Sequence, residues 1–191
     1  MIGKKNIVFG FLYLVLTASL GPLMIVKHFP AVGNAEAAKQ EQLGKLQQGL
    51  GNDFMDENLE PMKPAQIAKL NAQSILSLSS RINAEEPVDE VRNAHAHGNL
   101  EALLNIAAGF LLCFVAISRR FKQVISWTFI AGAVLHSGLL YLTQGLQVSW
   151  AATLASSPIT YLGPILVLAA LAMAGVAALV GFRGEIVRDY Q

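Results

Sequence analysis

The stretch from Asn93 to Glu101 holds the side chains best suited to chemistry. It reads Asn-Ala-His-Ala-His-Gly-Asn-Leu-Glu and places the imidazoles of His95 and His97 and the carboxylate of Glu101 at the head of the apolar run Leu100–Ser118. A charged group at the centre of a membrane helix costs about 2.5–3.5 kcal/mol on insertion scales, and less near the interface. A partner, a cavity or a cofactor must therefore accommodate these groups.

Helical spacing separates the two histidines and leaves three uses open. His97, Glu101 and Asn105 are spaced i, i+4, i+8 and share one stripe, whereas His95 points about 200° away from His97. In the structural use, Glu101 pairs with a histidine or a basic group, and Asn105 hydrogen-bonds across a bundle. In the second use, two or three histidines, His95 and His97 among them, hold a zinc, copper or iron ion together with a carboxylate. In the third, a histidine at the head of the span ligates heme.

A later apolar run contributes further polar side chains, His136 and Tyr141. His136 lies toward the end of that run that we expect to meet the same membrane face as Glu101. A carboxylate in a low-dielectric interior becomes neutral unless cations or hydrogen-bond donors hold it charged. We therefore expect Glu101 to point away from lipid and to pair with His95, His97 or His136.

The composition predicts the elements that position these groups. The chain has 191 residues, 53% of them hydrophobic and 14% charged. About 20 residues of helix cross a bilayer core of about 30 Å, and soluble helices rarely stay apolar on every face for that length. We therefore predict an all-α bundle with four transmembrane spans, its main partner being the lipid bilayer. The net charge of +1 gives no indication of a nucleic-acid partner. The predicted spans are Asn6–Val26, Leu100–Ser118, Gln123–Thr143 and Tyr161–Phe182.

Basic residues in the short flanks of these spans predict the orientation. The loop 144–160 contains no Lys or Arg, whereas the flanks on the other side are basic. Short basic loops stay in the cytoplasm. We predict a multi-pass protein of the bacterial inner membrane with both termini cytoplasmic. The basic flanking residues are Lys4, Lys5, Arg119, Arg120, Lys122, Arg183 and Arg188.

Residues 27–97 form the long segment between the first two spans, and we predict that it lies outside the cytoplasm. Two amphipathic helices, 34–50 and Pro64–Ile82, predict an extracytoplasmic helical hairpin. The hairpin either caps the membrane bundle or forms a docking surface for a partner or a neighbouring subunit. The apolar stripes are Leu43, Leu46 and Leu50 on the first helix, and Ile67, Asn71, Ile75, Leu78 and Ile82 on the second. The predicted divisions are 1–26 (first span), 27–97 (outer segment) and 98–191 (remaining spans).

The segment Ala94–Glu101 resembles the head of the second span in the styrene oxide isomerase family. Further along, Gly138–Leu142 is similar to that family's Gly-Phe-Tyr-Leu stretch. The resemblance covers about residues 92–182, and the family also has four spans. The coinciding positions at the head of the second span are Ala94, His95, Leu100, Ile106, Ala107 and Phe110.

This resemblance implies a cofactor and site residues. His95 corresponds to the histidine that ligates heme b, Glu101 to an asparagine beside the substrate, and Tyr141 to the active-site tyrosine. In the family, heme lies where neighbouring protomers of a trimer meet. The chain departs from the pattern at Glu101, and at Ala133, where the family has an aspartate. His97 is an alternative ligand because it alone shares a stripe with Glu101.

Two functions follow as hypotheses. One is an integral membrane heme b enzyme, an isomerase that uses ferric heme as a Lewis acid on a small apolar epoxide, with Glu101 and Tyr141 catalytic. The other is a non-catalytic heme-binding or structural subunit of a larger membrane complex, in which His136 would be a second axial ligand. Either protein would be a homo-oligomer or part of such a complex.

The predicted topology is testable with single cysteines in a variant that lacks the native Cys113. A cysteine at Gln47 should react with a membrane-impermeant maleimide in intact cells, because residues 27–97 lie outside. A cysteine at Arg120 should react only after the membrane is opened. The reverse pattern would invert the orientation.

Overall fold

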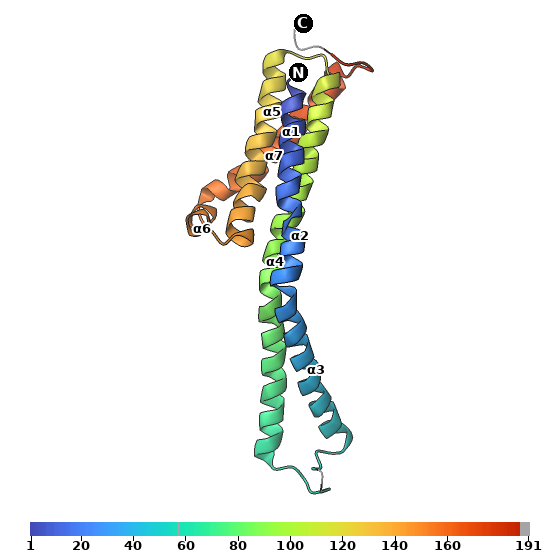
Figure 1. Cartoon of the computed structure of the whole chain (residues 1–191), viewed down its shortest axis with the longest axis vertical. Coiled ribbons are helices and arrows are strands. Elements are labelled where there is room, and N and C mark those ends of the chain that lie inside the picture. Colours follow the sequence, from blue (N-terminus) through green and yellow to red (C-terminus); the bar gives the residue numbers. More distant parts are fainter. Residues whose placement is uncertain (57, 188–191) are drawn as a thin grey trace. The chain divides into compact units, whose positions relative to one another are not determined.

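A computed structural model describes residues 1–56 and 58–187 of the chain (Figure 1). The described residues form helices and no strand, which confirms the all-α prediction. The stretches long and apolar enough to cross a membrane are Gly3–Lys27, Pro64–Phe114, Arg119–Gly145 and Pro158–Gly181. In chain order the helices are α1 (Gly3–Ala18), α2 (Leu20–Lys27), α3 (Phe29–Gly51), α4 (Pro64–Phe114), α5 (Arg119–Ala133), the π-helices η1 (Val134–Gly138) and η2 (Tyr141–Gly145), α6 (Ser149–Ala155), the 3-10 helix η3 (Pro158–Tyr161) and α7 (Leu162–Gly181).

The chain divides into two compact units. The first combines Met1–Pro22 with Glu90–Gln191, and the second is Leu23–Asp89. The divisions fall inside α2 and α4, so no loop marks them. α4 continues through Pro87 and through the His97–Gly98 step, with no break at the start of the second predicted span.

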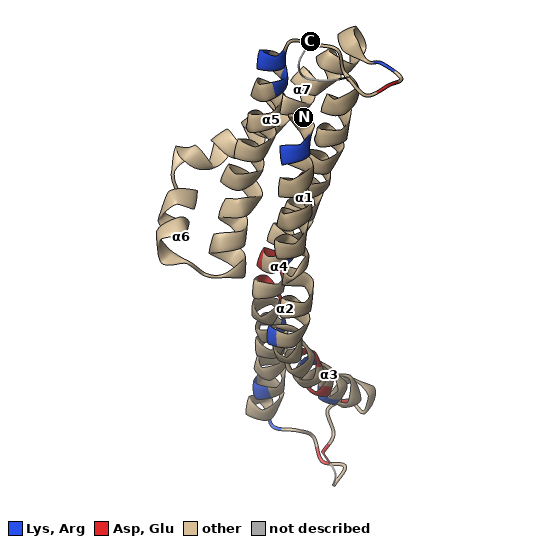
Figure 2. Ribbon diagram, turned by 45° about the horizontal axis from the view of Figure 1, so that its top comes forward, with Lys and Arg blue, Asp and Glu red and all other residues tan. Residues whose placement is uncertain are grey.

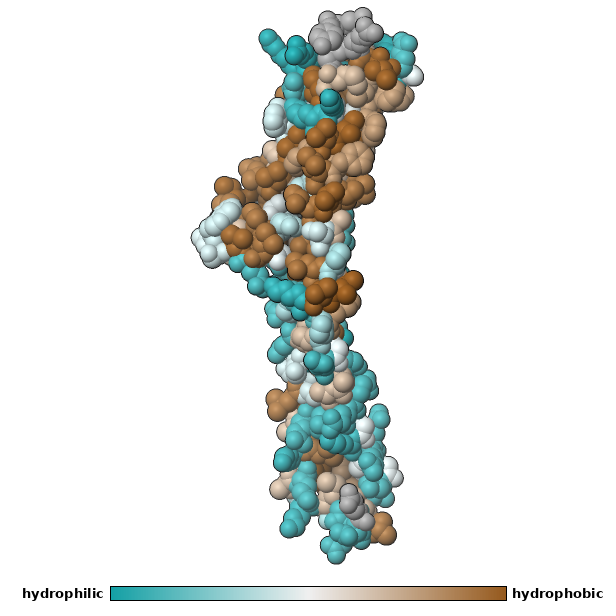
Figure 3. Space-filling model, in the orientation of Figure 1, coloured by the Kyte–Doolittle hydropathy of each residue, from teal (hydrophilic) through white to brown (hydrophobic). Residues whose placement is uncertain are grey.

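The first unit is a bundle of α1, the C-terminal part of α4, α5 and α7. Apolar side chains cover much of this unit in Figure 3, as expected of helices that are apolar on most faces. Glycines bring α1 against α4. A Cβ added to Gly3 would lie 2.1 Å from the Gly109 carbonyl oxygen, and one added to Gly10 would lie 2.7 Å from the Ala102 carbonyl oxygen. The two backbones approach so closely because no side chain separates them.

The start of α7 makes a similar contact with η1. A Cβ added to Gly163 would lie 2.5 Å from the backbone nitrogen of His136 and 2.8 Å from its Cα. On α5, a Cβ at Gly132 would lie 2.8 Å from Cγ2 of Val167. α7 therefore packs directly against the backbone of η1. This contact fixes the position of the His136 Cα atom, from which the side chain extends.

Basic residues mark the N-terminal ends of α1 and α5 in the first unit (Figure 2). Lys5 donates to Oε1 of Gln123 at 2.8 Å and lies 4.0 Å from the ring centroid of Trp127. Ser118 caps α5 by accepting a hydrogen bond from the backbone N–H of Phe121. The predicted basic residue Arg188 lies outside the described residues.

In the second unit, α3 packs against the N-terminal part of α4 through polar side chains. Arg81 donates to Glu36 at 2.7 Å, and the Ser74 hydroxyl donates to the Gln42 carbonyl oxygen at 3.3 Å. Hydrogen bonds from Lys39, Gln40 and Arg81 lower the pKa of the Glu36 carboxyl to about 2, so that this group is charged at neutral pH.

The apolar stripe predicted on the second helix of this unit lies on the outside. Ile75 and Ile82 are 66% and 67% exposed, and Leu78 is 41% exposed, whereas Ser74 and Ser77 are buried. The residues Pro64–Ile82 are helical, as the periodicity predicts. However, α3 does not cover the apolar face of this helix.

The contact between Gly163 and His136 gives a stability prediction with a matched control on the same helix. Gly163→Ala should lower the unfolding free energy in detergent by about 1–3 kcal/mol, because the new methyl group overlaps backbone atoms. Gly175→Ala should be neutral or stabilising, since no atom lies within 4 Å of a Cβ there and alanine favours helix. Equal thermal stability of the two variants would contradict the close contact.

Candidate functional site: a buried glutamate with histidine, serine and tyrosine

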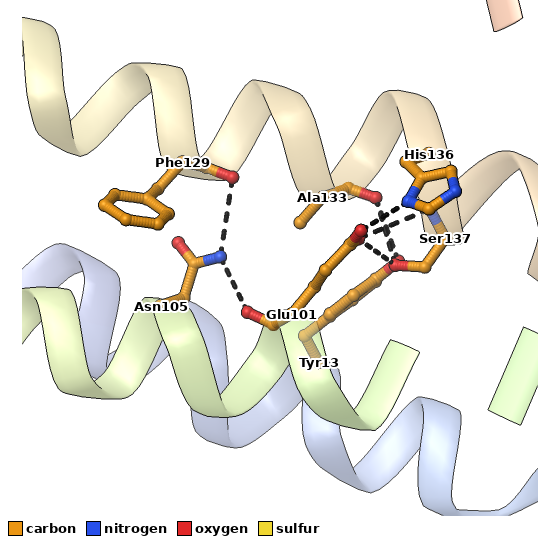
Figure 4. Close-up of polar contacts among 7 residues, drawn as sticks. All are labelled: Tyr13, Glu101, Asn105, Phe129, Ala133, His136 and Ser137. Carbon is orange, nitrogen blue, oxygen red and sulfur yellow. Dashed lines mark hydrogen bonds and ion pairs between the residues drawn. The ribbon is translucent and has the colours of Figure 1, made fainter. Parts of the chain in front are cut away.

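Glu101 lies on α4 and faces the interior of the first unit, with only 4% of the residue exposed. His136 Nδ1 donates to its Oε1 at 2.5 Å, and the Ser137 hydroxyl donates to its Oε2 at 2.5 Å (Figure 4). The backbone N–H of Ser137 approaches the same Oε2 at 3.4 Å. The expectation that this carboxylate is paired and points inward is confirmed, and His136 is the histidine that pairs with it.

The π-helix η1 brings two consecutive residues to one carboxylate. In an α-helix, neighbouring side chains point about 100° apart. The wider π-turn over Val134–Gly138 places His136 on one oxygen of Glu101 and Ser137 on the other. Single π-turns inside helices are found often at functional sites.

Tyr13 of α1 extends this hydrogen-bonded group. Its hydroxyl lies 2.8 Å from the Ser137 hydroxyl and 3.2 Å from the Ala133 carbonyl oxygen. Because Ser137 has one hydroxyl proton and directs it to Glu101, Tyr13 is the donor toward Ser137 or Ala133. The result is a continuous set of hydrogen bonds, Tyr13–Ser137–Glu101–His136, which we call the carboxylate network.

His97 lies beside the carboxylate network at the surface of the unit. Its ring contacts the ring of His136 edge to face, with centroids 4.8 Å apart and an interplanar angle of 62°. His97 is exposed, and among the described residues no hydrogen bond engages its ring. His136 donates from Nδ1, so in the neutral ring Nε2 carries the lone pair. A carboxylate–histidine pair of this kind fixes the tautomer and the orientation of the ring, as in many metal sites.

His95 has a different environment. Its Nδ1 lies 2.9 Å from the Thr17 carbonyl oxygen, which can only accept, so Nδ1 carries the proton. The Asn99 side-chain amide lies 3.2 Å from Nε2 and donates to it, while the Thr17 hydroxyl donates to Oδ1 of Asn99 at 2.8 Å. Both nitrogens of His95 are therefore engaged, Nδ1 by Thr17 of α1 and Nε2 by Asn99 of its own helix.

A second buried set of polar side chains lies one turn away along α4. The Asn6 amide donates to Oδ1 of Asn105 at 3.0 Å and to the Ser126 carbonyl oxygen at 3.1 Å, and the Ser126 hydroxyl donates back to Asn6. The Asn105 amide donates to the Glu101 carbonyl oxygen at 3.0 Å. This set confirms the expected role of Asn105 across the bundle and fixes the register of α1, α4 and α5 around Glu101.

The structure places Tyr13, and not the predicted Tyr141, in the carboxylate network. Tyr141 begins η2 and is half-buried, and no described residue hydrogen-bonds its hydroxyl. The tyrosine that joins the carboxylate network is Tyr13, which the sequence analysis did not select. The sequence does contain a pattern that indicates Tyr13. The polar residues Asn6, Tyr13 and Thr17 interrupt the first apolar run at spacings that place them on one helix face.

Groups of three or more His, Cys, Asp or Glu side chains able to hold a metal ion do not occur in the described part of the chain. The metal-ligand pair predicted from sequence, His95 and His97, is not brought together with a third ligand. A heme iron needs only one or two protein ligands, so that question rests on the individual histidines.

No family model, curated protein or solved structure matches the chain.

The pairing of Glu101 predicts a pattern of stabilities. Glu101→Leu should lower the unfolding free energy in detergent by about 1–3 kcal/mol for each buried donor left without an acceptor. Replacing both partners, Glu101→Leu with His136→Leu, should recover part of that loss, because the orphaned ring is then removed as well. Additive losses in the double variant would contradict a direct Glu101–His136 interaction.

Proposed function

We propose that this chain is a multi-pass protein of the bacterial inner membrane with cytoplasmic termini and an extracytoplasmic hairpin formed by α3 and the start of α4. The four long apolar helical stretches support the spans. The basic residues at the starts of α1 and α5 support the orientation, since short basic flanks stay in the cytoplasm.

We further propose that the protein binds heme b through His97. The observation that carries this proposal is an exposed imidazole, free of hydrogen bonds to the described residues, beside a histidine held by a buried carboxylate. His95, the ligand implied by resemblance, fits less well because both of its nitrogens are engaged by Thr17 and Asn99. A ligand on the outer surface of the bundle also suits a group shared between copies in a homo-oligomer.

His97 and His136 do not fit as two ligands of the same heme. Their rings touch edge to face, with centroids 4.8 Å apart, which leaves no room for a macrocycle between them. The arrangement therefore favours His97 as the one histidine of this chain that would hold the group, and it speaks against the electron carrier in which His136 would be a second ligand.

The reaction that we propose is the isomerisation of a small apolar epoxide to a carbonyl compound. Bound ferric heme would supply a Lewis acid for the epoxide oxygen. Glu101, held by His136 and Ser137, provides a fixed negative charge suited to stabilise a developing cation. His136 can hold or return a proton at Nε2 while its Nδ1 stays on the carboxylate. Apolar helices around the site would limit capture of the cation by water.

The non-catalytic alternative is favoured by one observation. Both carboxylate oxygens of Glu101 are already occupied by donors from the protein. A buried network in which every hydrogen bond is made can have a purely structural role, because it rigidifies the core. Turnover of an epoxide distinguishes the isomerase from a heme-binding subunit, and the absence of bound heme would leave the structural subunit.

The test uses full-length protein purified from cells supplied with hemin. Wild type should show a Soret band that His97→Ala removes, while His95→Ala and the matched control His28→Ala keep it. Glu101→Gln and Tyr141→Phe should keep the band and lower conversion of a small apolar epoxide to its carbonyl product.

Several outcomes would overturn parts of this proposal. Wild type without a Soret band rejects heme and the isomerase together. Loss of the band in His95→Ala instead of His97→Ala returns the ligand to His95. A bis-histidine spectrum keeps heme and rejects the isomerase, because no position for the substrate remains.

A further inference from the structure

Basic side chains of two helices meet where the N-terminal ends of α1 and α5 lie side by side (Figure 2). Lys4 and Lys5 are in the first turn of α1, and Arg119 and Arg120 begin α5. We call these four residues the basic cluster. In the described part of the chain, no carboxylate forms an ion pair with any of the four. The cluster is therefore a concentration of positive charge that the protein itself does not neutralise.

Gln123 holds one of these cations in a defined position. Lys5 donates one of its three N–H groups to Oε1 of Gln123 at 2.8 Å, and its ammonium lies 4.0 Å from the ring centroid of Trp127. Two N–H groups of Lys5 remain for another acceptor. Arg119 and Trp127 lie one helical turn before and after Gln123, so these three side chains share one face of α5.

An apolar surface continues from the basic cluster along both helices. On α5, Trp127 is 58% exposed and Val124 is 51% exposed, and on α1 Val8 and Leu12 are exposed one and two turns after the lysines. Among the described residues, none accepts a hydrogen bond from the indole N–H of Trp127. Tryptophans of membrane proteins commonly lie at the level of the lipid headgroups, where the ring is in an apolar layer and the N–H meets polar groups.

We propose that the basic cluster and Trp127 bind the headgroup of an anionic phospholipid, whose acyl chains lie along Val8, Leu12 and Val124. The order of groups along the two helices is the order of groups along such a lipid. The cations meet the phosphate, the indole N–H meets the glycerol ester, and the exposed aliphatic side chains meet the acyl chains.

Charge complementarity selects an anionic lipid over a zwitterionic one. A zwitterionic headgroup carries its own cation, which the four basic side chains would repel. An anionic headgroup brings only negative charge, and basic pockets between membrane helices on the cytoplasmic side are known to bind such lipids. Both helices also begin at this end, so the partial charges of their first N–H groups add to the positive potential.

Basic flanks that only orient the protein in the membrane would not need this arrangement. Orientation depends on the number of Lys and Arg residues near the ends of the spans. It requires neither that cations of two helices meet nor that a glutamine holds one of them over an exposed tryptophan. The inference rests on the proposed membrane insertion, but it is independent of heme and of catalysis.

The two tryptophans of the chain, Trp127 and Trp150, allow a direct test by fluorescence. Full-length Trp150→Phe protein is reconstituted into phosphatidylcholine bilayers that contain a minor fraction of lipid with brominated acyl chains, which quench nearby indoles. Brominated phosphatidylglycerol should quench Trp127 more strongly than brominated phosphatidylcholine at the same mole fraction. The matched control is Trp127→Phe, in which Trp150 of α6 should show no such preference.

Charge variants then test the basic cluster itself. Arg119→Gln and Arg120→Gln remove exposed side chains without a described partner, so the fold should be retained. Each should lower the relative affinity of the Trp127 site for phosphatidylglycerol by about fivefold. Arg183→Gln removes another exposed cation, after α7 and outside the cluster, and should leave the preference unchanged.

Each contrary result has a distinct meaning. Equal quenching of Trp127 by the two brominated lipids would overturn the proposal while leaving membrane insertion intact. No quenching of either tryptophan by either lipid would reject membrane insertion itself. An equal loss in Arg183→Gln would show that general surface charge, and not a defined site, produces the preference. Loss of the preference on addition of inorganic phosphate at constant ionic strength would show a site for a free anion in place of a lipid.

Discussion

The buried carboxylate of Glu101 is the constraint on which the first unit depends. Such a group has a large desolvation cost in an apolar bundle unless several donors meet it. Here the donors come from His136 and Ser137, and Tyr13 supports Ser137 from a third helix. Sliding α1 or the helix that carries His136 by one residue would leave the charge without partners, so the carboxylate selects the register of the bundle.

Backbone geometry makes this arrangement possible. The π-turn at Val134–Gly138 lets consecutive residues reach one carboxylate, and Gly163 lets α7 support that turn at contact distance. Gly3 and Gly10 bring α1 close enough to α4 for Tyr13 to reach the carboxylate network. The small residues thus shape the carboxylate network indirectly, by setting the distance between the helices that carry the polar groups.

The two units follow opposite packing rules. The first places Glu101, Asn105 and Ser137 inside an apolar bundle, where each of these side chains finds a partner. The second joins its helices through Glu36, Ser74 and Arg81 and leaves Ile75 and Ile82 exposed. A membrane environment suits the first arrangement. The second leaves the apolar side chains of Ile75 and Ile82 without a partner from α3.

The sequence by itself determined the helical class, the four long apolar stretches and the polar cluster around His97 and Glu101. These follow from composition and from the helical period, which are local properties of the chain. It also indicated that Glu101 would need a partner, because the cost of an unpaired carboxylate does not depend on the fold.

Only the tertiary structure decided which partner that is. Glu101 and His136 lie more than thirty positions apart, and their contact depends on the register between two helices. It also depends on the π-turn η1, which no local sequence pattern predicts. The same holds for Tyr13, which lies far from Ser137 in sequence, and for the engagement of His95 by Thr17. The exposure of Ile75 and Ile82 could likewise not be predicted from the sequence. Periodicity shows that a helix has an apolar face, and only packing decides what that face contacts.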